Sequence, residues 1–153
     1  MGGIAEELVR VRLAGEADVF AIESLLRAIP GVWQGSWRGD CVERCVVAAE
    51  GLAMLAEVGG VVIGFAAAHD TGFRGYLSEL AVAEEWQGRG VGRLLLAAVE
   101  RALVARGCGL VVADVFPPAE GFYRKRGWGY PASVLMSHRT MEGDFFRGSG
   151  GAC

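Results

Sequence analysis

The chain has 153 residues, of which 52% are hydrophobic and 22% are charged, a composition that excludes disorder and fits one packed domain. The formal net charge of −3 disfavours a general binder of nucleic-acid backbones. The longest uncharged apolar run, residues 58–68, is shorter than the roughly 20 residues that cross a membrane, and the first residues do not resemble a signal peptide. We therefore expect a cytoplasmic protein that binds neither nucleic acid nor membranes, with its four cysteines as thiols.

The first third of the chain predicts one strand and two helices. Residues 8–13 alternate between apolar side chains and arginine, which is typical of a half-buried strand. Apolar residues then recur at helical spacing over 19–29, and a Pro-Gly pair ends this helix. Residues 32–39 combine tryptophans with glycine, glutamine and serine and are expected to form a loop. A second helix is predicted over 40–50, with Asp40 as its N-cap.

Three strands are predicted in the middle of the chain. Residues 53–58 and 61–69 flank two consecutive glycines, which is a signal for a two-residue hairpin. Residues 70–75 are expected to form a turn, and residues 76–82 form the next strand. These strands are expected to make up most of one sheet.

The last third predicts two helices and two strands. Residues 91–106 carry an apolar face at helical spacing. Residues 110–116 are almost continuously apolar, which predicts a strand buried on both faces. A short helix over 119–126 and a final strand over 134–139 follow. The glycine-rich segment 142–153 is expected to be a flexible tail.

The order of these elements, β-α-α-β-β-β-α-β-α-β, predicts an α/β (α+β) fold. A mixed sheet with helices on both faces accommodates this order. The sequence shows neither an internal repeat nor a linker long enough to divide it. We therefore expect a single domain over residues 1–141.

Residues 87–93, with the sequence Gln-Gly-Arg-Gly-Val-Gly-Arg, form the most informative segment of the chain. They lie between the strand 76–82 and a helix. Glycines allow a sharp turn and a close approach of the backbone to a ligand. The helix that follows directs its first N–H groups and the positive end of its dipole toward the turn. With Arg89 and Arg93 added, this arrangement predicts a binding site for a pyrophosphate.

Other phosphate-binding motifs do not fit this sequence. A Walker loop requires Gly-Lys followed by Ser or Thr, whereas the only lysine is Lys125, which follows Arg124. A dinucleotide-binding fingerprint that starts at Gly88 would need a glycine at the position of Arg93. The sequence also lacks the G-x-S-x-G motif of hydrolases.

Three segments, in this order, resemble the motifs of one known family. Residues 77–82 resemble the strand that precedes its pyrophosphate loop, and Gln87, Gly90 and Gly92 match the loop pattern Q/R-x-x-G-x-G/A. Residues 119–128 are similar to its segment A-x-x-F/L-Y-x-x-x-G-F/W. The chain is thereby identified as similar to the GNAT superfamily of acetyl-CoA-dependent N-acetyltransferases, and the resemblance spans most of its length.

The resemblance implies a GNAT-like, mostly antiparallel sheet with a splayed central strand pair, formed by residues 76–82 and 110–116. Acetyl-CoA (coenzyme A) would enter the gap, its pantetheine amides would pair with backbone groups of strand 76–82, and its pyrophosphate would bind residues 88–93. The implied cofactor-binding residues are Leu80, Ala81, Val82, Gln87, Gly88, Arg89, Gly90, Val91, Gly92, Arg93, Ala119, Phe122 and Tyr123.

The implied reaction is attack of a neutral amine on the acetyl thioester. Tyr123 matches the acid that protonates the departing thiolate, although it could instead only orient the cofactor. A backbone N–H near Leu80 is expected to stabilise the oxyanion. Glu79 and Asp114 are the alternatives for the general base, and Glu79 could also be a structural acceptor for nearby N–H groups.

The acceptor is expected to contact the variable segments of the chain. The candidate substrate-binding residues are Trp33, Trp37, Asp70, Arg74 and Glu79. For each of these the alternative is an ordinary structural role: a hydrophobic lid for the tryptophans, and solvated surface or local hydrogen bonding for the carboxylates.

The remaining polar candidates have simpler interpretations. Cys41 and Cys45 are four residues apart, but no other Cys or His has the spacing of a metal site, so both are expected to be small buried hydrophobes and no metal is predicted. His69 and His138 are expected to be strand-end side chains rather than catalysts.

The predicted function is transfer of an acetyl group from acetyl-CoA to the primary amine of a small-molecule or amino-acid-like acceptor, by direct attack in a ternary complex. The alternatives are a protein or peptide N-acetyltransferase and a non-catalytic acyl-CoA-binding sensor. The resemblance also makes a homodimer plausible, because proteins of this family pair through sheet edges or C-terminal strands.

Overall fold

The computed structural model describes residues 8–141, which divide into two compact units between Val112 and Ala113. The first unit contains a five-stranded sheet in the order β1-β2-β3-β4-β5. Neighbouring strands are antiparallel, except that β4 and β5 are parallel. The predicted mixed, mostly antiparallel sheet is therefore confirmed. The strands are β1 (Arg10–Leu13), β2 (Ala53–Val58), β3 (Val61–Asp70), β4 (Gly75–Val82) and β5 (Val111–Val112).

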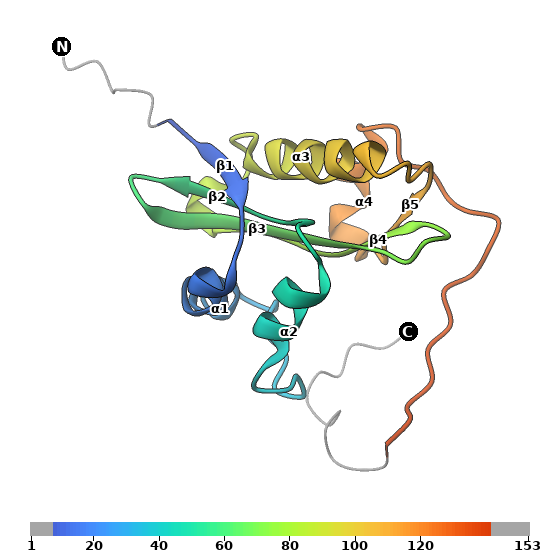
Figure 1. Cartoon of the computed structure of the whole chain (residues 1–153), viewed down its shortest axis with the longest axis horizontal. Coiled ribbons are helices and arrows are strands. Elements are labelled where there is room, and N and C mark those ends of the chain that lie inside the picture. The colour runs from blue at the N-terminus through green and yellow to red at the C-terminus, as the bar shows by residue number, and fades with distance from the viewer. Residues whose placement is uncertain (1–7, 142–153) are drawn as a thin grey trace. The chain divides into compact units, whose positions relative to one another are not determined.

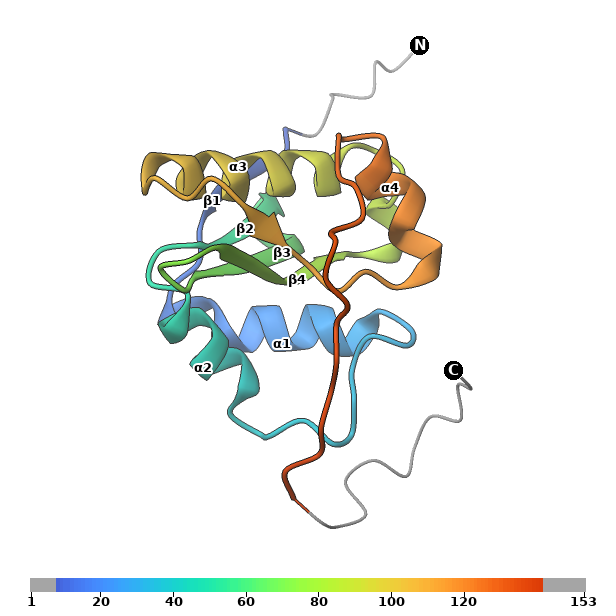
Figure 2. The ribbon, with the colours of Figure 1, turned by 90° about the vertical axis from the view of Figure 1, so that its right-hand side faces the viewer.

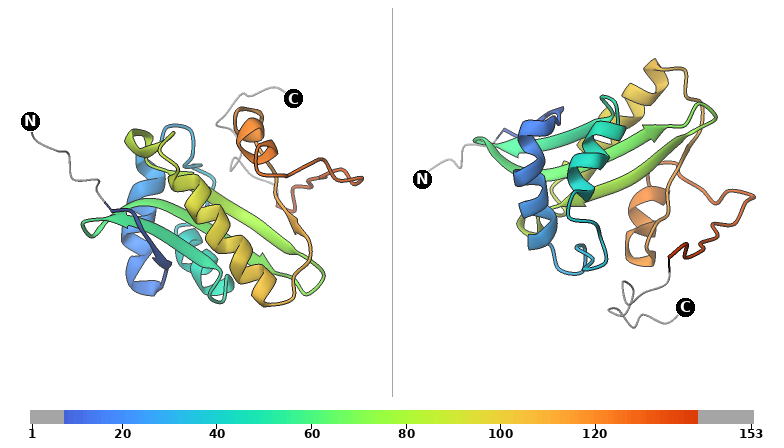
Figure 3. Two further views of the ribbon diagram at one scale, coloured as in Figure 1. Left: turned by 90° about the horizontal axis from the view of Figure 1, so that it is seen from above. Right: turned by 60° about the horizontal axis from the view of Figure 1, so that its bottom comes forward.

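Helices cover both faces of this sheet. The helix α3 (Val91–Ala105) lies on one face, whereas α1 (Val19–Ala28) and α2 (Cys41–Ala48) lie on the other (Figures 1 and 2). Figure 3 shows α3 running along the direction of the strands, and α1 and α2 next to each other. Since α3 connects the two parallel strands, it is the crossover that a parallel pair requires. None of the helices within residues 8–141 is both long and apolar enough to cross a membrane.

The helical periodicity of the sequence explains how the helices pack. Ile22 and Leu26 of α1 are buried at a spacing of four residues, and Leu95 and Leu103 of α3 are completely buried. Gly64 of β3 has a packing role, because a Cβ atom at this position would lie 2.8 Å from Leu95 Cδ1. The lack of a side chain on β3 therefore allows α3 to approach the sheet closely.

The ends of α1 and α2 differ slightly from the prediction. α1 stops at Ala28, because Ile29 precedes a proline and adopts an extended conformation. Asp40 occupies the N-cap position of α2 but makes no side-chain capping bond. Its carboxylate instead forms surface ion pairs with Arg38 and Arg44.

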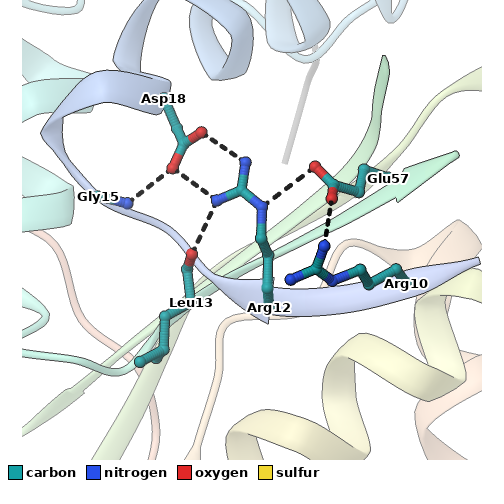
Figure 4. Close-up of polar contacts among 6 residues, drawn as sticks. All are labelled: Arg10, Arg12, Leu13, Gly15, Asp18 and Glu57. Carbon is teal, nitrogen blue, oxygen red and sulfur yellow. Dashed lines mark hydrogen bonds and ion pairs between the residues drawn. The ribbon is translucent and has the colours of Figure 1, made fainter. Parts of the chain in front are cut away.

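Arg12 connects β1 to the segment that leads into α1 (Figure 4). Its guanidinium donates hydrogen bonds of 2.8 and 3.0 Å to the two carboxylate oxygens of Asp18, and its Nε atom donates one of 3.1 Å to Glu57 on β2. Asp18, in the 3-10 turn η1 (Glu16–Asp18), also accepts a hydrogen bond from the Gly15 N–H. The predicted alternation of β1 fails at its end, because Leu13 is 57% exposed.

β5 is much shorter than the strand predicted over residues 110–116. Only Val111 and Val112 form the strand, and they pair with Gly75 and Tyr76 of β4. The apolar run predicts burial, but a strand also requires a neighbouring backbone with which to form hydrogen bonds. The β4–β5 ladder ends after Tyr76, as a splayed strand pair predicts.

The second unit begins with helical turns. The turn η3 (Pro117–Ala119) leads directly into α4 (Glu120–Arg124), and Gly127 follows at a φ of +84°. The single helix predicted over 119–126 is therefore divided between two shorter elements. Pro117 and Pro118 occupy the first two positions of η3, where a helix requires no backbone N–H donor.

The final strand predicted over 134–139 is wrong, because these residues form no strand in the described part of the chain. Val134 is 84% exposed and Met136 is 88% exposed. The apolar composition of the segment predicts a strand, but within residues 113–141 no partner strand is present. The predicted tail, residues 142–153, lies outside the described residues.

Candidate active site

The turn between β4 and α3 has the geometry of an anion cradle. After the 3-10 turn η2 (Glu84–Trp86), Gly88 and Gly90 adopt left-handed conformations with φ of +73° and +88°. The first N–H that bonds back across the start of α3 is that of Leu94, which donates to the Gly90 carbonyl at 3.1 Å. The N–H groups of the first helical turn, beginning at Val91, therefore have no acceptor within the helix.

Gln87 fixes this turn to the end of β4. Its Nε2 atom donates a 3.0 Å hydrogen bond to the Val82 carbonyl, and its backbone N–H donates to the Glu84 carbonyl. One lone pair of the Val82 carbonyl is thus used within the protein. The two other strand residues predicted to bind the cofactor differ in exposure, since Leu80 is half-buried whereas Ala81 is buried.

Two arginines bring positive charge to the turn. The Arg89 guanidinium lies over the Trp86 ring at 4.7 Å from its centroid, which orients the side chain by a cation–π contact. The Arg93 guanidinium lies close to Gly90, where a Cβ atom would meet its Nη2 atom at 3.7 Å. Positive charge, helix N–H groups and positive-φ glycines together fit a phosphate group.

A β-bulge interrupts β4 in its centre. Ala67 of β3 pairs with Glu79, whereas the adjacent Ala68 pairs with Leu77, so that Ser78 is the extra residue. Bulges alter the direction of nearby side chains and are over-represented beside active sites. The predicted site residue Glu79 thus directly follows an irregular position of the strand.

The structure brings together three polar side chains that the sequence analysis did not connect. His69 at the end of β3 and Ser78 on β4 are hydrogen bonded, with 2.9 Å between Nε2 and Oγ. The Cys45 Sγ atom of α2 lies 4.0 Å from this Nε2 and 3.9 Å from this Oγ. The three residues come from different elements and have no motif spacing, and the bulge register of β3 and β4 places Ser78 beside His69.

Trp33 and Trp37, two of the predicted substrate-binding residues, lie in the loop between α1 and α2. Their rings pack edge to face with centroids 5.4 Å apart. The Arg27 guanidinium lies 3.8 Å from the Trp33 centroid, so one face of this ring already holds a cation of the protein. The contact supports the structural alternative for Trp33.

The turn between β3 and β4 is stabilised by local hydrogen bonds. The Asp70 carboxylate accepts a hydrogen bond from the Gly72 N–H at 2.9 Å, which is typical of an Asx turn. The Arg74 carbonyl accepts hydrogen bonds from the backbone and the hydroxyl of Thr71. Asp70 therefore has a structural role, and its proposed contact with a substrate remains a prediction.

In the second unit, Tyr123 of α4 lies among aromatic rings. The centroids of Phe122 and Trp128 are each 5.1 Å from its ring. Burial and, to a smaller extent, the negative charge of Asp114 raise the pKa of Tyr123 to about 12. A phenol of this kind stays protonated at neutral pH and keeps its proton available for donation. Ala119, another predicted cofactor contact, precedes α4 directly.

The two cysteines of α2 are half-buried thiols. Burial raises the pKa of both Cys41 and Cys45, and the negative charge of Glu79 raises the pKa of each further. The negative charge of Glu79 is therefore felt on the side of the sheet that α2 covers. Within residues 8–141, no group of three or more His, Cys, Asp or Glu side chains is arranged to hold a metal ion.

Comparisons with known proteins identify the family. The sequence model of the Acetyltransferase (GNAT) family matches residues 20–128, and the chain belongs to this family. A solved structure of the aminoglycoside N-acetyltransferase AAC(6′)-Iy in complex with CoA is similar to this chain. The TM-score is 0.72 and the sequence identity is 19%, over 91% of this chain and 99% of that chain.

Two further solved structures share the fold. The ribosomal-protein-alanine N-acetyltransferase from Brucella melitensis biovar Abortus 2308 gives a TM-score of 0.68 at 20% identity, over 86% of this chain and 100% of that chain. Ard1 from Thermoplasma volcanium gives 0.69 at 20% identity, over 81% of this chain and 84% of that chain.

The predicted family and its acetyltransferase class are therefore confirmed. Coenzyme A or a CoA-containing bisubstrate analogue is bound in two solved structures of AAC(6′)-Iy, which agrees with acetyl-CoA as the cosubstrate of this fold. The assignments of single residues to the cofactor, the acceptor and the chemical steps stay predictions.

Proposed function

We propose that the protein transfers the acetyl group of acetyl-CoA to the primary amine of a small-molecule or amino-acid-like acceptor, by direct attack in a ternary complex. The observation that carries the proposal is the cradle before α3. It combines the left-handed Gly90 with the N–H groups at the start of α3 and the guanidinium groups of Arg89 and Arg93. Family membership supplies the reaction class.

In this proposal the cradle residues bind the diphosphate of the cosubstrate. The N–H groups of Val91, Gly92 and Arg93 donate hydrogen bonds to its oxygens, and the guanidinium of Arg89 adds a charge-assisted contact. Gln87 keeps the turn in this conformation through its bond to the strand end. When bound, acetyl-CoA supplies a thioester carbonyl that an amine can attack.

Two groups of the chain are assigned to the charges that develop during transfer. The Leu80 N–H donates to the oxyanion of the tetrahedral intermediate. Tyr123 donates its proton to the departing thiolate. Burial and the charge of Asp114 support the second assignment, because both keep the phenol protonated. The charge of Asp114 thereby favours the protonated form of Tyr123, and Glu79 and Asp114 stay the carboxylate alternatives for the general base.

The acceptor is proposed to be a cationic amine. Glu79 lies beside the bulge, and its carboxylate attracts an ammonium group. AAC(6′)-Iy is described as an aminoglycoside N-acetyltransferase, whereas the Brucella neighbour is named for a protein alanine, so the fold occurs with both kinds of acceptor. The choice of a small amine over a peptide is tested directly by an acceptor screen.

The screen measures free thiol released from acetyl-CoA with polyamines, amino acids, aminoglycosides and peptides with free N-termini. Release with a small amine supports the proposal. Release with peptides alone would assign a peptide acetyltransferase, and no release by a protein that binds acetyl-CoA would favour the non-catalytic sensor. The Tyr123→Phe variant is the matched inactive control for any turnover found.

A further inference from the structure

The hydrogen-bonded pair of His69 and Ser78 provides a proton acceptor on the side of the sheet that α2 covers. We propose that His69 accepts the proton that the acceptor's ammonium group gives up, and that Ser78 is a positioning residue that holds its imidazole in the required tautomer. The inference rests on the proposed function and replaces a carboxylate as the general base.

The position of the Ser78 hydrogen is linked to the tautomer of His69. The Ser78 Oγ atom donates to the Ala67 carbonyl at 3.3 Å and lies 2.9 Å from His69 Nε2. A hydroxyl has one hydrogen, and a carbonyl can only accept. If this hydrogen goes to Ala67, Oγ must accept from an Nε2–H group, and the lone pair of the neutral ring is then on Nδ1.

The location of the pair supports a role in the reaction. Ser78 is the extra residue of the β4 bulge and directly precedes Glu79 and Leu80, which the proposed function assigns to the acceptor and the oxyanion. His69 is half-buried at the end of β3. The hydrogen bond to Ser78 at the bulge fixes the orientation of the imidazole, which a base requires.

The groups near the imidazole come from α2, β3 and β4. On α2 the Cys45 thiol lies 4.0 Å from Nε2, and burial raises the pKa of Cys45, so this thiol is neutral at pH 7. Glu79 follows the bulge on β4, Asp70 follows His69 in β3, and Tyr76 is its register partner.

On α1, the negative charge of Glu23 raises the pKa of the Cys41 thiol, and Glu23 also forms an ion pair with Arg27. The carboxylate of Glu79 attracts the ammonium group of an acceptor. Glu79 would thus concentrate the substrate while His69 takes its proton. Catalytic efficiency is highest when the base titrates close to the working pH, which favours imidazole over a carboxylate.

The proton count of the transfer is balanced. The ammonium nitrogen loses one proton to His69 Nδ1, which passes it to solvent. The neutral nitrogen then forms the N–C bond, the C–S bond breaks, and the thiolate receives a proton from the acid. The second proton lost by nitrogen restores that acid, so that the reaction releases the amide, the thiol and one proton.

The decisive variant is His69→Gln, because its amide Nε2 can still donate to Ser78 while no basic nitrogen remains. The matched control is His138→Gln, the same substitution at the other histidine of the chain. We would measure kcat/KM from pH 5.5 to 9 with neamine, spermidine and L-lysine as probes, together with acetyl-CoA binding by calorimetry. Long-range 1H–15N correlation spectra of the wild-type protein would identify the tautomer of His69.

We expect His69→Gln to lower kcat/KM about 10²-fold at pH 7.5 and to remove the acid limb of the pH profile. Acetyl-CoA affinity and the His138→Gln control should be unchanged. Ser78→Ala should cause a smaller loss and convert part of the His69 signal to the Nδ1–H tautomer.

Two results would overturn the inference while leaving the proposed function intact. One is a wild-type Nδ1–H tautomer, and the other is an unchanged pH profile in His69→Gln. A wild-type protein that binds no acetyl-CoA and turns over none of the probes would contradict the proposed function and the inference together.

Discussion

Removing the negative charge of Asp18 should destabilise the first unit, and the structure indicates by how much. In the Asp18→Asn variant one carboxylate oxygen becomes an NH2 group. All the contacts of this carboxylate come from donors, namely two N–H groups of Arg12 and the N–H of Gly15. At least one of these three N–H groups then faces the new NH2 group, which is also a donor, and loses its hydrogen bond. Hydrogen bonds to charged groups contribute about 1.5–3 kcal/mol.

The Asp18 side chain is only 16% exposed, so solvent screens its ion pair incompletely. We therefore expect the free energy of unfolding to fall by about 2 kcal/mol, and Tm to fall by roughly 4–8 °C for a chain of this size. Equilibrium urea unfolding, followed by circular dichroism, measures the first quantity. The matched control is Asp40→Asn, because the Asp40 side chain is 51% exposed and its ion pairs lie on the surface.

The Asp40→Asn control should lower the free energy of unfolding by less than about 0.5 kcal/mol. The pH dependence provides a second check. Since hydrogen bonds from Arg12 lower the pKa of Asp18, its contribution is complete above the unfolded-state value of about 3.9 and is lost as the pH falls through the lower folded-state value. The stability difference between wild type and Asp18→Asn should therefore shrink below about pH 4. Equal losses in the two variants, or a difference independent of pH, would refute this reasoning.

Three further predictions concern the site. Gly90→Val should abolish detectable CoA binding in calorimetry, because φ at this position is +88° and a β-branched residue is strained there; normal affinity would contradict the cradle. Gln87→Ala should weaken CoA binding severalfold by releasing the turn from the Val82 carbonyl, and unchanged affinity would show that this bond is dispensable. Tyr123→Phe should lower kcat about 10²-fold with CoA affinity retained. Because the pKa of Tyr123 is about 12, its ionisation should cause no alkaline loss of wild-type activity below about pH 10, and an earlier loss that Tyr123→Phe lacks would argue against the assignment.

The elements that the sequence predicted well are those with local signals. α1 and α3 have clear helical periodicity, and the hairpin between β2 and β3 has two glycines at its turn. The glycines of 87–93 predict a sharp turn, and Gly88 and Gly90 form it with positive φ, whereas Gly92 already lies in α3. Three motifs in the right order predict the family, and the match of the family model confirms it.

The elements that failed depend on partners distant in the sequence. The apolar residues of 110–116 and 134–139 predict strands, but a strand exists only where another backbone accepts its hydrogen bonds. Asp40 is of a residue type that favours the N-cap position, yet two nearby arginines form ion pairs with its carboxylate. These outcomes depend on tertiary contacts that local patterns do not contain.

The His69–Ser78 pair shows the same limit in the candidate site. Neither residue belongs to a motif, and their hydrogen bond depends on one residue of register between two strands. A bulge cannot be predicted from alternation alone, because the extra residue only becomes visible once the pairing is known. The His69–Ser78 pair could therefore be found only from the strand pairing that the structure shows.

Titration calorimetry of the folded wild-type protein with coenzyme A and acetyl-CoA is the most direct test of the claim that the turn before α3 binds a diphosphate. We expect saturable heat with both ligands and a loss of this heat in the Gly90→Val variant. No heat with either ligand, from protein shown by circular dichroism to be folded, would contradict the claim and the proposed function that depends on it.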